Sequence, residues 1–213
     1  MKIAVISDIH ANLSALKEVL KHIEAENCDK VVCLGDIVLA GPQPKETIDF
    51  VRAQDWIVIQ GNTDKLIADY GDDVLAMMKK NFPIMANAIT DDIKRISQDD
   101  ISYLRNLPAQ MLLDFDNVTT LLVHGSPRAN NEDILPNMPL VNVEEIVRGV
   151  EADLILCGHT HIPCGYQTHN QKTLVNVGSV GRPMTSNPLA CYVTIDFYDG
   201  NLNKLSIDGK NTV

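Results

Sequence analysis

The 213-residue chain lacks long apolar runs and is poor in basic residues. No stretch approaches the ~20 apolar residues that a membrane-spanning helix needs, and the four consecutive apolar residues near the N-terminus are too few for a signal peptide. Eighteen Lys and Arg against 28 Asp and Glu give a net charge of −10, which repels nucleic-acid backbones and anionic membranes. We therefore expect a cytoplasmic protein without broad nucleic-acid or membrane binding, in which a phosphate-bearing ligand needs a local positive site.

Cysteines are also few, and their number is odd. None of the five is spaced as Cys-x-x-Cys, and Cys33 and Cys157 lie in apolar runs, where a free cysteine behaves as a small buried hydrophobe. This usage is typical of a reducing compartment. With one domain expected per ~150 residues, the length predicts a single domain over residues 1–213, with a core that needs no disulfide.

Short apolar runs alternate with amphipathic segments in the first 60 residues. Apolar residues recur at helical spacing from Leu13 to Ile23, and Pro44 stands near the start of a second helical segment. We expect strands at 2–7, 30–34 and 56–60, with helices at 13–23 and 44–53. This rhythm predicts a mostly parallel sheet with helices packed on it.

The rhythm changes after the third strand. Residues 65–107 have a helical pattern that ends at Pro108, which predicts a cap-like helical insertion. Beyond it we expect strands at 111–114, 119–123, 153–157, 173–177, 189–196 and 202–207, a helix at 143–150, and a hairpin turn at Asp199-Gly200. These strands predict a second sheet within the same domain.

Side chains with metal-ligand chemistry follow five of the predicted strands. They are Asp8 and His10, Asp36, Asn62 and Asp64, His124, and His159 and His161. Each motif alone is more often a surface loop than a ligand pair. Because ligands bind at the carboxyl ends of the strands in open α/β sheets, the five motifs together predict one metal site.

These motifs resemble, in order, the five-block signature of the calcineurin-like metallophosphoesterase superfamily. The blocks are Asp8-x-His10, Gly35-Asp36, Gly61-Asn62-x-Asp64, His124 and Gly158-His159-x-His161. The resemblance implies an α/β fold, a four-layer α/β/β/α sandwich of two mixed sheets flanked by helices, with a dinuclear metal site at the strand C-terminal ends. Residues 178–183 and the compact size are similar to the small bacterial and archaeal phosphoesterases.

The resemblance also implies which residues hold each of two divalent ions. The first ion takes Asp8, His10 and His161, the second takes Asn62, His124 and His159, and Asp36 bridges both. Mixed imidazole and oxygen ligands suit Mn, Fe, Zn, Co or Ni better than Mg or Ca, and we favour Mn.

The implied activity is hydrolysis of a small phosphodiester or phosphomonoester through a bridging hydroxide. Asp36, Asn62, Asp64 and Arg128 are the candidate catalytic residues. Asp64 either orients a ligand or caps a helix, and Arg128 and Arg182 either reach the phosphate or face solvent. Asn12 favours a helix cap, whereas Ser7, His22 and His169 are expected to be bystanders.

Two departures from the family pattern limit what the resemblance implies. Thr63 stands where many relatives have a histidine that serves the leaving group, and residues 37–42 lack the arginine of relatives that cleave phosphoproteins or diadenosine tetraphosphate. The missing arginine weakens a protein-phosphatase assignment more than the general one. A nucleotide or dinucleoside-polyphosphate hydrolase or a protein phosphatase remains the alternative. A scaffold or binding module on the same fold is the non-enzyme alternative, and the oligomeric state is left open.

Overall fold

The computed structural model describes residues 1–186, 189–197 and 206–212, the last range as backbone only. The expected turn at Asp199-Gly200 and the start of the strand at 202–207 lie outside these residues. Within them, one mixed sheet has the order β10-β9-β1-β2-β3. Its strands are β1 (Lys2–Ile6), β2 (Lys30–Cys33), β3 (Ile57–Val58), β9 (Ala190–Asp196) and β10 (Ser206–Thr212). β1, β2 and β3 run parallel, as expected, whereas β9 is antiparallel to β1 and β10 is antiparallel to β9.

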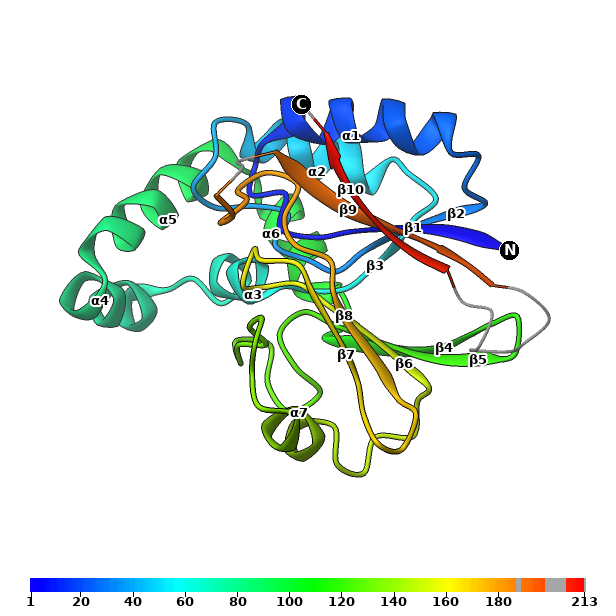
Figure 1. Cartoon of the computed structure of the whole chain (residues 1–213). Helices are drawn as coiled ribbons and strands as arrows, with labels where there is room; N and C mark the ends of the chain where they lie inside the picture. The colour runs from blue at the N-terminus through cyan, green and yellow to red at the C-terminus, as the bar shows by residue number, and fades with distance from the viewer. Residues whose placement is uncertain (187–188, 198–205, 213) are drawn as a thin grey trace.

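A second mixed sheet packs against the first (Figure 1), with the order β4-β5-β6-β8-β7. Its strands are β4 (Gln110–Phe115), β5 (Val118–Val123), β6 (Leu154–Cys157), β7 (Cys164–Gln167) and β8 (Thr173–Asn176). β7 has no counterpart among the predicted strands, because it is a four-residue edge strand interrupted by Gly165 and pairs only with β8 in the described chain.

Helices cover the outer faces of both sheets (Figure 1). α1 (Leu13–Ala25) and α2 (Pro44–Arg52) lie over the first sheet, and α7 (Leu140–Ile146) lies over the second. The four-layer α/β/β/α sandwich is therefore confirmed. α7 begins three residues before its predicted start, directly after Pro139, and Gly149 turns the chain beyond its end with a φ of 75°.

The alternation of side chains along the strands explains the three buried clusters between the layers. Ala4 and Ile6 of β1 face the helices, whereas Ile3 and Val5 face the second sheet. On β5, Leu122 points between the sheets and its neighbours on either side point toward α7. β1 and β5 therefore bury both faces, which is why the sequence shows continuous apolar runs here.

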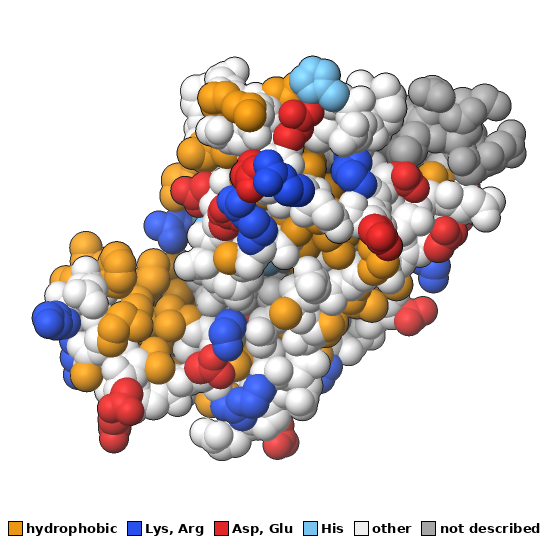
Figure 2. Space-filling model, turned by 90° about the horizontal axis from the view of Figure 1, so that it is seen from below, with side chains coloured by type: hydrophobic (Ala, Val, Ile, Leu, Met, Phe, Trp, Pro, Cys, Tyr) orange, Lys and Arg blue, Asp and Glu red, His pale blue; other side chains and the backbone are white. Residues whose placement is uncertain are grey.

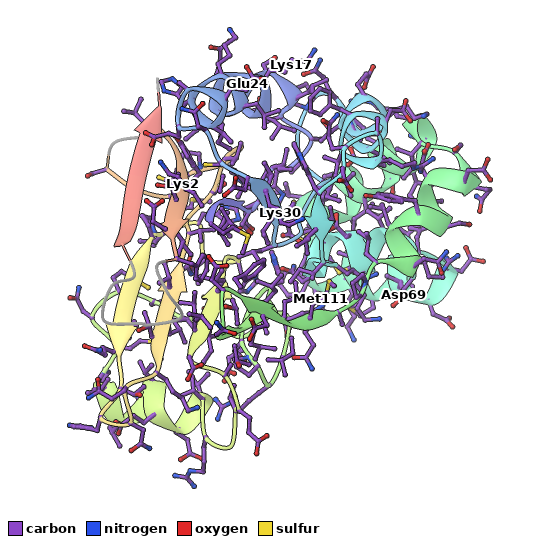
Figure 3. The ribbon with its side chains drawn as sticks, turned by 90° about the vertical axis from the view of Figure 1, so that its right-hand side faces the viewer. Lys2, Lys17, Glu24, Lys30, Asp69 and Met111 are labelled. Carbon is purple, nitrogen blue, oxygen red and sulfur yellow. The ribbon has the colours of Figure 1, made fainter. Side chains whose placement is uncertain are left out.

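The first helix follows its sequence pattern closely. The Asn12 side chain caps α1 by accepting a hydrogen bond from Ala15 N, at 3.1 Å. Lys17 and Glu24 project from the outer face of α1 into solvent (Figure 3), opposite the buried apolar stripe.

Residues 62–106 form four helices between β3 and β4. These are α3 (Asn62–Ala68), α4 (Asp72–Asn81), α5 (Pro83–Arg95) and α6 (Gln98–Asn106). α3 packs on α6, close to the sheet, while α4 and the first half of α5 project away from the sandwich as an arm (Figure 1). Pro83 starts α5 because proline fits the first turn of a helix but cannot continue the preceding one.

The five cysteines are all free. No helix in the described part of the chain is both long enough and apolar enough to cross a bilayer.

Candidate metal centre

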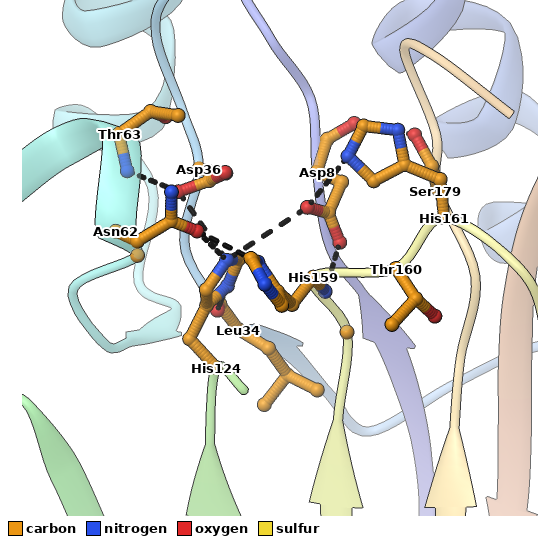
Figure 4. Close-up of polar contacts among 12 residues, drawn as sticks. Asp8, Leu34, Asp36, Asn62, Thr63, His124, His159, Thr160, His161 and Ser179 are labelled. Atoms are coloured by element: carbon orange, nitrogen blue, oxygen red, sulfur yellow. Dashed lines mark hydrogen bonds and ion pairs between the residues drawn. The ribbon is translucent and has the colours of Figure 1, made fainter. Parts of the chain in front are cut away.

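Five loops at the carboxyl ends of β1, β2, β3, β5 and β6 meet at one edge of the sandwich (Figure 4). The Asp8 Oδ1 atom lies 3.2 Å from His161 Nε2. The two oxygens of Asp36 point in different directions, with Oδ1 3.4 Å from His124 Nε2 and Oδ2 3.6 Å from His10 Nε2. The motifs that are up to 153 residues apart in the sequence therefore form one cluster, and its carboxylates are buried.

The backbone of these loops adopts conformations that side chains usually avoid. Positive φ angles occur at Asp8 (55°), His10 (48°), Asp36 (54°), His159 (70°) and His161 (61°). Each such residue costs roughly 1–2 kcal/mol relative to the right-handed region. Strain of this kind concentrates at functional sites, where it fixes the direction of a side chain.

Two glycines let the loops approach each other. A Cβ atom at Gly61 would lie 2.1 Å from Asp36 Oδ1, and one at Gly158 would lie 2.5 Å from Asp8 Oδ2. The space is used for hydrogen bonds to the carboxylates, because Thr63 N donates to Asp36 Oδ1 and His159 N donates to Asp8 Oδ2. Any larger residue at either position would separate two of the loops.

Backbone carbonyls determine the tautomer of three histidines. The Nδ1 atoms of His10, His124 and His161 lie 3.1, 2.7 and 2.7 Å from the carbonyl oxygens of Leu39, Leu34 and Arg182. A carbonyl oxygen can only accept, so each Nδ1 carries the proton and donates it. In the neutral ring, the lone pair of each Nε2 atom is therefore directed into the cluster, which is how proteins orient histidines that bind metals.

The lone pairs converge on two places. His10 Nε2 and His161 Nε2 are 3.0 Å apart, and both lie within 3.8 Å of Asp8 Oδ1, which is buried and makes no hydrogen bond in the described chain. At the second place, Asn62 Oδ1 lies 2.9 Å from His124 Nε2 and 2.8 Å from His159 Nδ1. Once their ring nitrogens are deprotonated, the atoms at each place are all acceptors, and a cation between them relieves their repulsion, so the residues fit a pair of metal ions.

The pKa shifts in the cluster also favour the binding of a cation. Burial alone would raise the pKa of Asp36, but the neighbouring His124 outweighs it and the pKa is lowered. Burial opposes the charge on His124 too, yet Asp36 and Asp8 raise the pKa of this imidazole to about 10, so that without a metal its Nε2 atom carries a proton, which a bound cation would replace. Burial lowers the pKa of His10 and His159, so both remain neutral imidazoles that can act as ligands. The two carboxylates therefore stay ionised and attract positive charge.

Asp64 connects two of the loops rather than entering the cluster. Its Oδ1 atom accepts hydrogen bonds from Ile37 N and Val38 N, at 2.9 and 3.2 Å, and its Oδ2 atom accepts one from Gly61 N, at 3.0 Å. Burial, followed by the charge of Asp36, raises the pKa of Asp64 to about 7. The side chain thus caps α3 and also holds the loop that carries Asp36, so both alternatives left by the sequence describe part of its role.

Asp133 lies beside the cluster, and sequence reasoning did not single it out. Its Oδ1 atom is 3.3 Å from His159 Nε2, on the far side of the ring from Asn62. An exposed aspartate in an irregular loop carries no sequence signal that distinguishes it from its neighbours.

The two candidate arginines have different surroundings. The guanidinium of Arg128 forms a two-pronged ion pair with Glu132 and lies outside the cavity beside the cluster. Arg182 lines that cavity, and its backbone is held by the Ser179 hydroxyl, which accepts from Arg182 N and donates to Asp8 O. His22 and His169 are exposed and remote from the cluster, as expected.

The cavity has a volume of about 490 Å³ and opens between the cluster and the arm of α4 and α5. His10, Asp36, Asn62, His159 and His161 are among the residues that line it. The volume lies within the 300–1,000 Å³ range of small-molecule sites.

Comparison with known proteins gives consistent relatives. A model of the calcineurin-like phosphoesterase superfamily domain matches residues 1–200. The chain is 30% identical to the uncharacterized protein MJ0912 of Methanocaldococcus jannaschii, covering 97% of this chain and 87% of that protein. It is 27% identical to the phosphodiesterase YfcE of Escherichia coli, with 92% and 88% covered. The crystal structure of a metallophosphoesterase from Sphaerobacter thermophilus superposes with a TM-score of 0.77 at 25% identity, covering 100% of this chain and 89% of that one.

Proposed function

The chain belongs to the calcineurin-like phosphoesterase superfamily and is a hydrolase of phosphoester bonds, and from this premise we propose that it cleaves a small phosphodiester or phosphomonoester with two bound metal ions. The observation that carries the proposal is the convergence of histidine lone pairs and carboxylate oxygens on two adjacent places. The similarity to the phosphodiesterase YfcE supports a diester as the first substrate to test.

We assign the ligands as the geometry groups them. Asp8, His10 and His161 surround one place, Asn62, His124 and His159 surround the other, and Asp36 presents one oxygen toward each. Imidazole and oxygen donors suit Mn, Fe, Zn, Co or Ni, and we propose Mn. When bound, a pair of such ions supplies hydroxide from a water of lowered pKa and offsets the charge of the phosphoryl oxygens.

The chain itself positions the reactants. Asp36 sets the separation of the two places, because its two oxygens diverge toward His10 and His124. Arg182 lines the cavity, and we propose that its guanidinium binds a phosphoryl oxygen. The Thr63 hydroxyl donates to Val38 O, so it is engaged with the backbone and supplies no proton to a leaving group.

The test is turnover of bis(p-nitrophenyl) phosphate by protein stripped with EDTA and then supplied with Mn²⁺. Activity should be absent after stripping and return on addition of Mn²⁺. His161→Ala should abolish the recovery, whereas the matched control His169→Ala, which changes an exposed histidine far from the cluster, should recover fully. Full activity in EDTA would refute the proposal.

A further inference from the structure

We propose that the substrate of this enzyme carries an apolar group on its single phosphate, and that the arm binds this group; the inference rests on the proposed function. The binding surface, called here the apolar wall, consists of Leu39, Ala40, Phe82, Ile84, Met85 and Ala88.

The apolar wall and the metal ligands share one cavity. The lining combines candidate ligands with the loop of Leu39 and Ala40 and the start of α5. A phosphate held by the ligands therefore has its ester substituent in the same cavity as the wall. Because the ligands and the apolar wall line the same cavity, the molecule that fills it must combine a phosphoester with an apolar surface.

The wall exposes more apolar surface than folding requires. The exposed fractions of Phe82, Ile84 and Met85 are 57%, 87% and 39%. Figure 2 shows the hydrophobic side chains that gather over the projecting arm. A contiguous exposed apolar patch on a soluble domain marks a binding surface.

The start of α5 also departs from what helix stability favours. Phe82 occupies the N-cap position without any side-chain hydrogen bond, and the first turn contains no acidic residue. A Ser, Thr, Asp or Asn at this position would stabilise the helix by satisfying a backbone N–H group. Instead, Phe82 stands at the N-cap position, and three apolar residues, Pro83, Ile84 and Met85, follow it. All of these side chains line the cavity.

The charges around the cavity exclude a polyphosphate. Arg182 is the only Lys or Arg among the described residues that line it, and the wall contains no polar side chain. A nucleoside triphosphate or dinucleoside polyphosphate carries several negative charges, which need cations along the length of the site. The charge of a single phosphate is balanced by the metal ions and Arg182 alone. Transfer of its apolar substituent from water to the wall is favourable.

The experiment uses p-nitrophenyl alkyl phosphates with methyl, propyl and hexyl groups, so that the leaving group is constant. In the Mn²⁺-loaded protein, kcat/KM should rise by about two- to fourfold for each methylene that reaches the wall. Met85→Gln should reduce the hexyl-to-methyl ratio by at least fivefold. Met77→Gln is the matched control, because Met77 is a similarly exposed methionine on the same arm (46%) that does not line the cavity, and it should leave the ratio unchanged.

A binding measurement supports the kinetics without turnover. Hexylphosphonate should bind more tightly than methylphosphonate in calorimetry, with a more negative heat-capacity change. A hexyl-to-methyl ratio near one in wild type, with metal-dependent hydrolysis of both esters, would overturn this inference and leave the proposed function standing. Absence of metal-dependent hydrolysis of every ester would overturn the proposed function instead. A dimer that Met85→Gln dissociates without changing the ratio would show that a second copy covers the wall, and would also overturn the inference.

Discussion

The carboxylate of Asp92 on α5 accepts a 2.9 Å hydrogen bond from the backbone N–H of Leu39, 53 residues earlier in the chain. The carbonyl oxygen of Leu39 accepts one in turn from His10 Nδ1, at 3.1 Å. A single residue, with a φ of 82°, therefore joins the second half of α5 to His10, a proposed metal ligand. The position of His10 depends on a helix that contributes no ligand.

Removing this carboxylate should weaken both the fold and the metal centre. Asp92→Ala leaves the buried N–H of Leu39 without an acceptor, which should lower the free energy of unfolding by about 1–3 kcal/mol. Mn²⁺ affinity should fall by about tenfold, the low end of the losses seen when a residue that orients a ligand is removed. Asp92→Asn is the control, because its amide oxygen keeps the acceptor. Equal losses in both variants, measured by urea unfolding and Mn²⁺ titration, would contradict this role.

The same residue predicts a pH dependence of stability. Burial raises the pKa of Asp92 to about 6, despite the bond from Leu39 and the nearby Arg95. The folded protein therefore holds a proton on Asp92 that the unfolded chain releases near pH 4, so this stabilising contribution is present below pH 4 and lost as the pH rises through 6. The stability gain of Asp92→Asn over wild type should grow between pH 4 and 6 and then level off. A difference that is constant across urea unfolding curves from pH 4 to 7.5 would argue against it.

The metal loops could be predicted from the sequence because their residues are chemically distinctive and follow strands. Asp8, Asp36 and His124 stand directly beyond buried apolar runs, and strand direction brings such positions together. The supporting contacts could not be predicted in this way. The bond between Asp92 and Leu39, and the approach of Asp133 to His159, join segments whose spacing carries no periodic signal.

The fold, too, could be predicted only in part from the sequence. The predicted bounds of the strands with continuous apolar runs lie within a few residues of the observed ones, because burial of both faces gives these strands a clear sequence pattern. β3 is shorter than its apolar pattern, because Gln60 N leaves the sheet and donates to Pro108 O instead. The projection of α4 and α5 as an arm depends on packing against the sandwich, which helical periodicity alone does not determine.

The rate should depend steeply on the leaving group. Thr63 lies in the cavity, where many relatives place a histidine, and its hydroxyl donates to Val38 O. Without a general acid, aryl esters should react about 10²–10⁴-fold faster than alkyl esters. Thr63→His should flatten the plot of log kcat/KM against leaving-group pKa, provided that metal analysis shows both ions retained. A shallow slope in wild type would mean that another group supplies the proton.

The two arginines should differ in their effect on substrate binding. Arg182→Ala should raise KM for bis(p-nitrophenyl) phosphate by about tenfold, since one charge-assisted hydrogen bond contributes about 1.5–3 kcal/mol. Arg128→Ala should change KM less than twofold, because the guanidinium is paired with Glu132 outside the cavity. The opposite order in steady-state kinetics would assign the phosphate contact to Arg128.

The proposed bridging position of Asp36 is the centre of this account, and anomalous diffraction from crystals soaked in Mn²⁺ tests it most directly. Two peaks should appear about 3.5–4 Å apart, one beside His10 and His161 and the other beside His124 and His159, with Asp36 between them. In the Asp36→Asn variant, at least one peak should be lost. A single peak in the wild type, or two peaks that Asp36 does not join, would contradict the account.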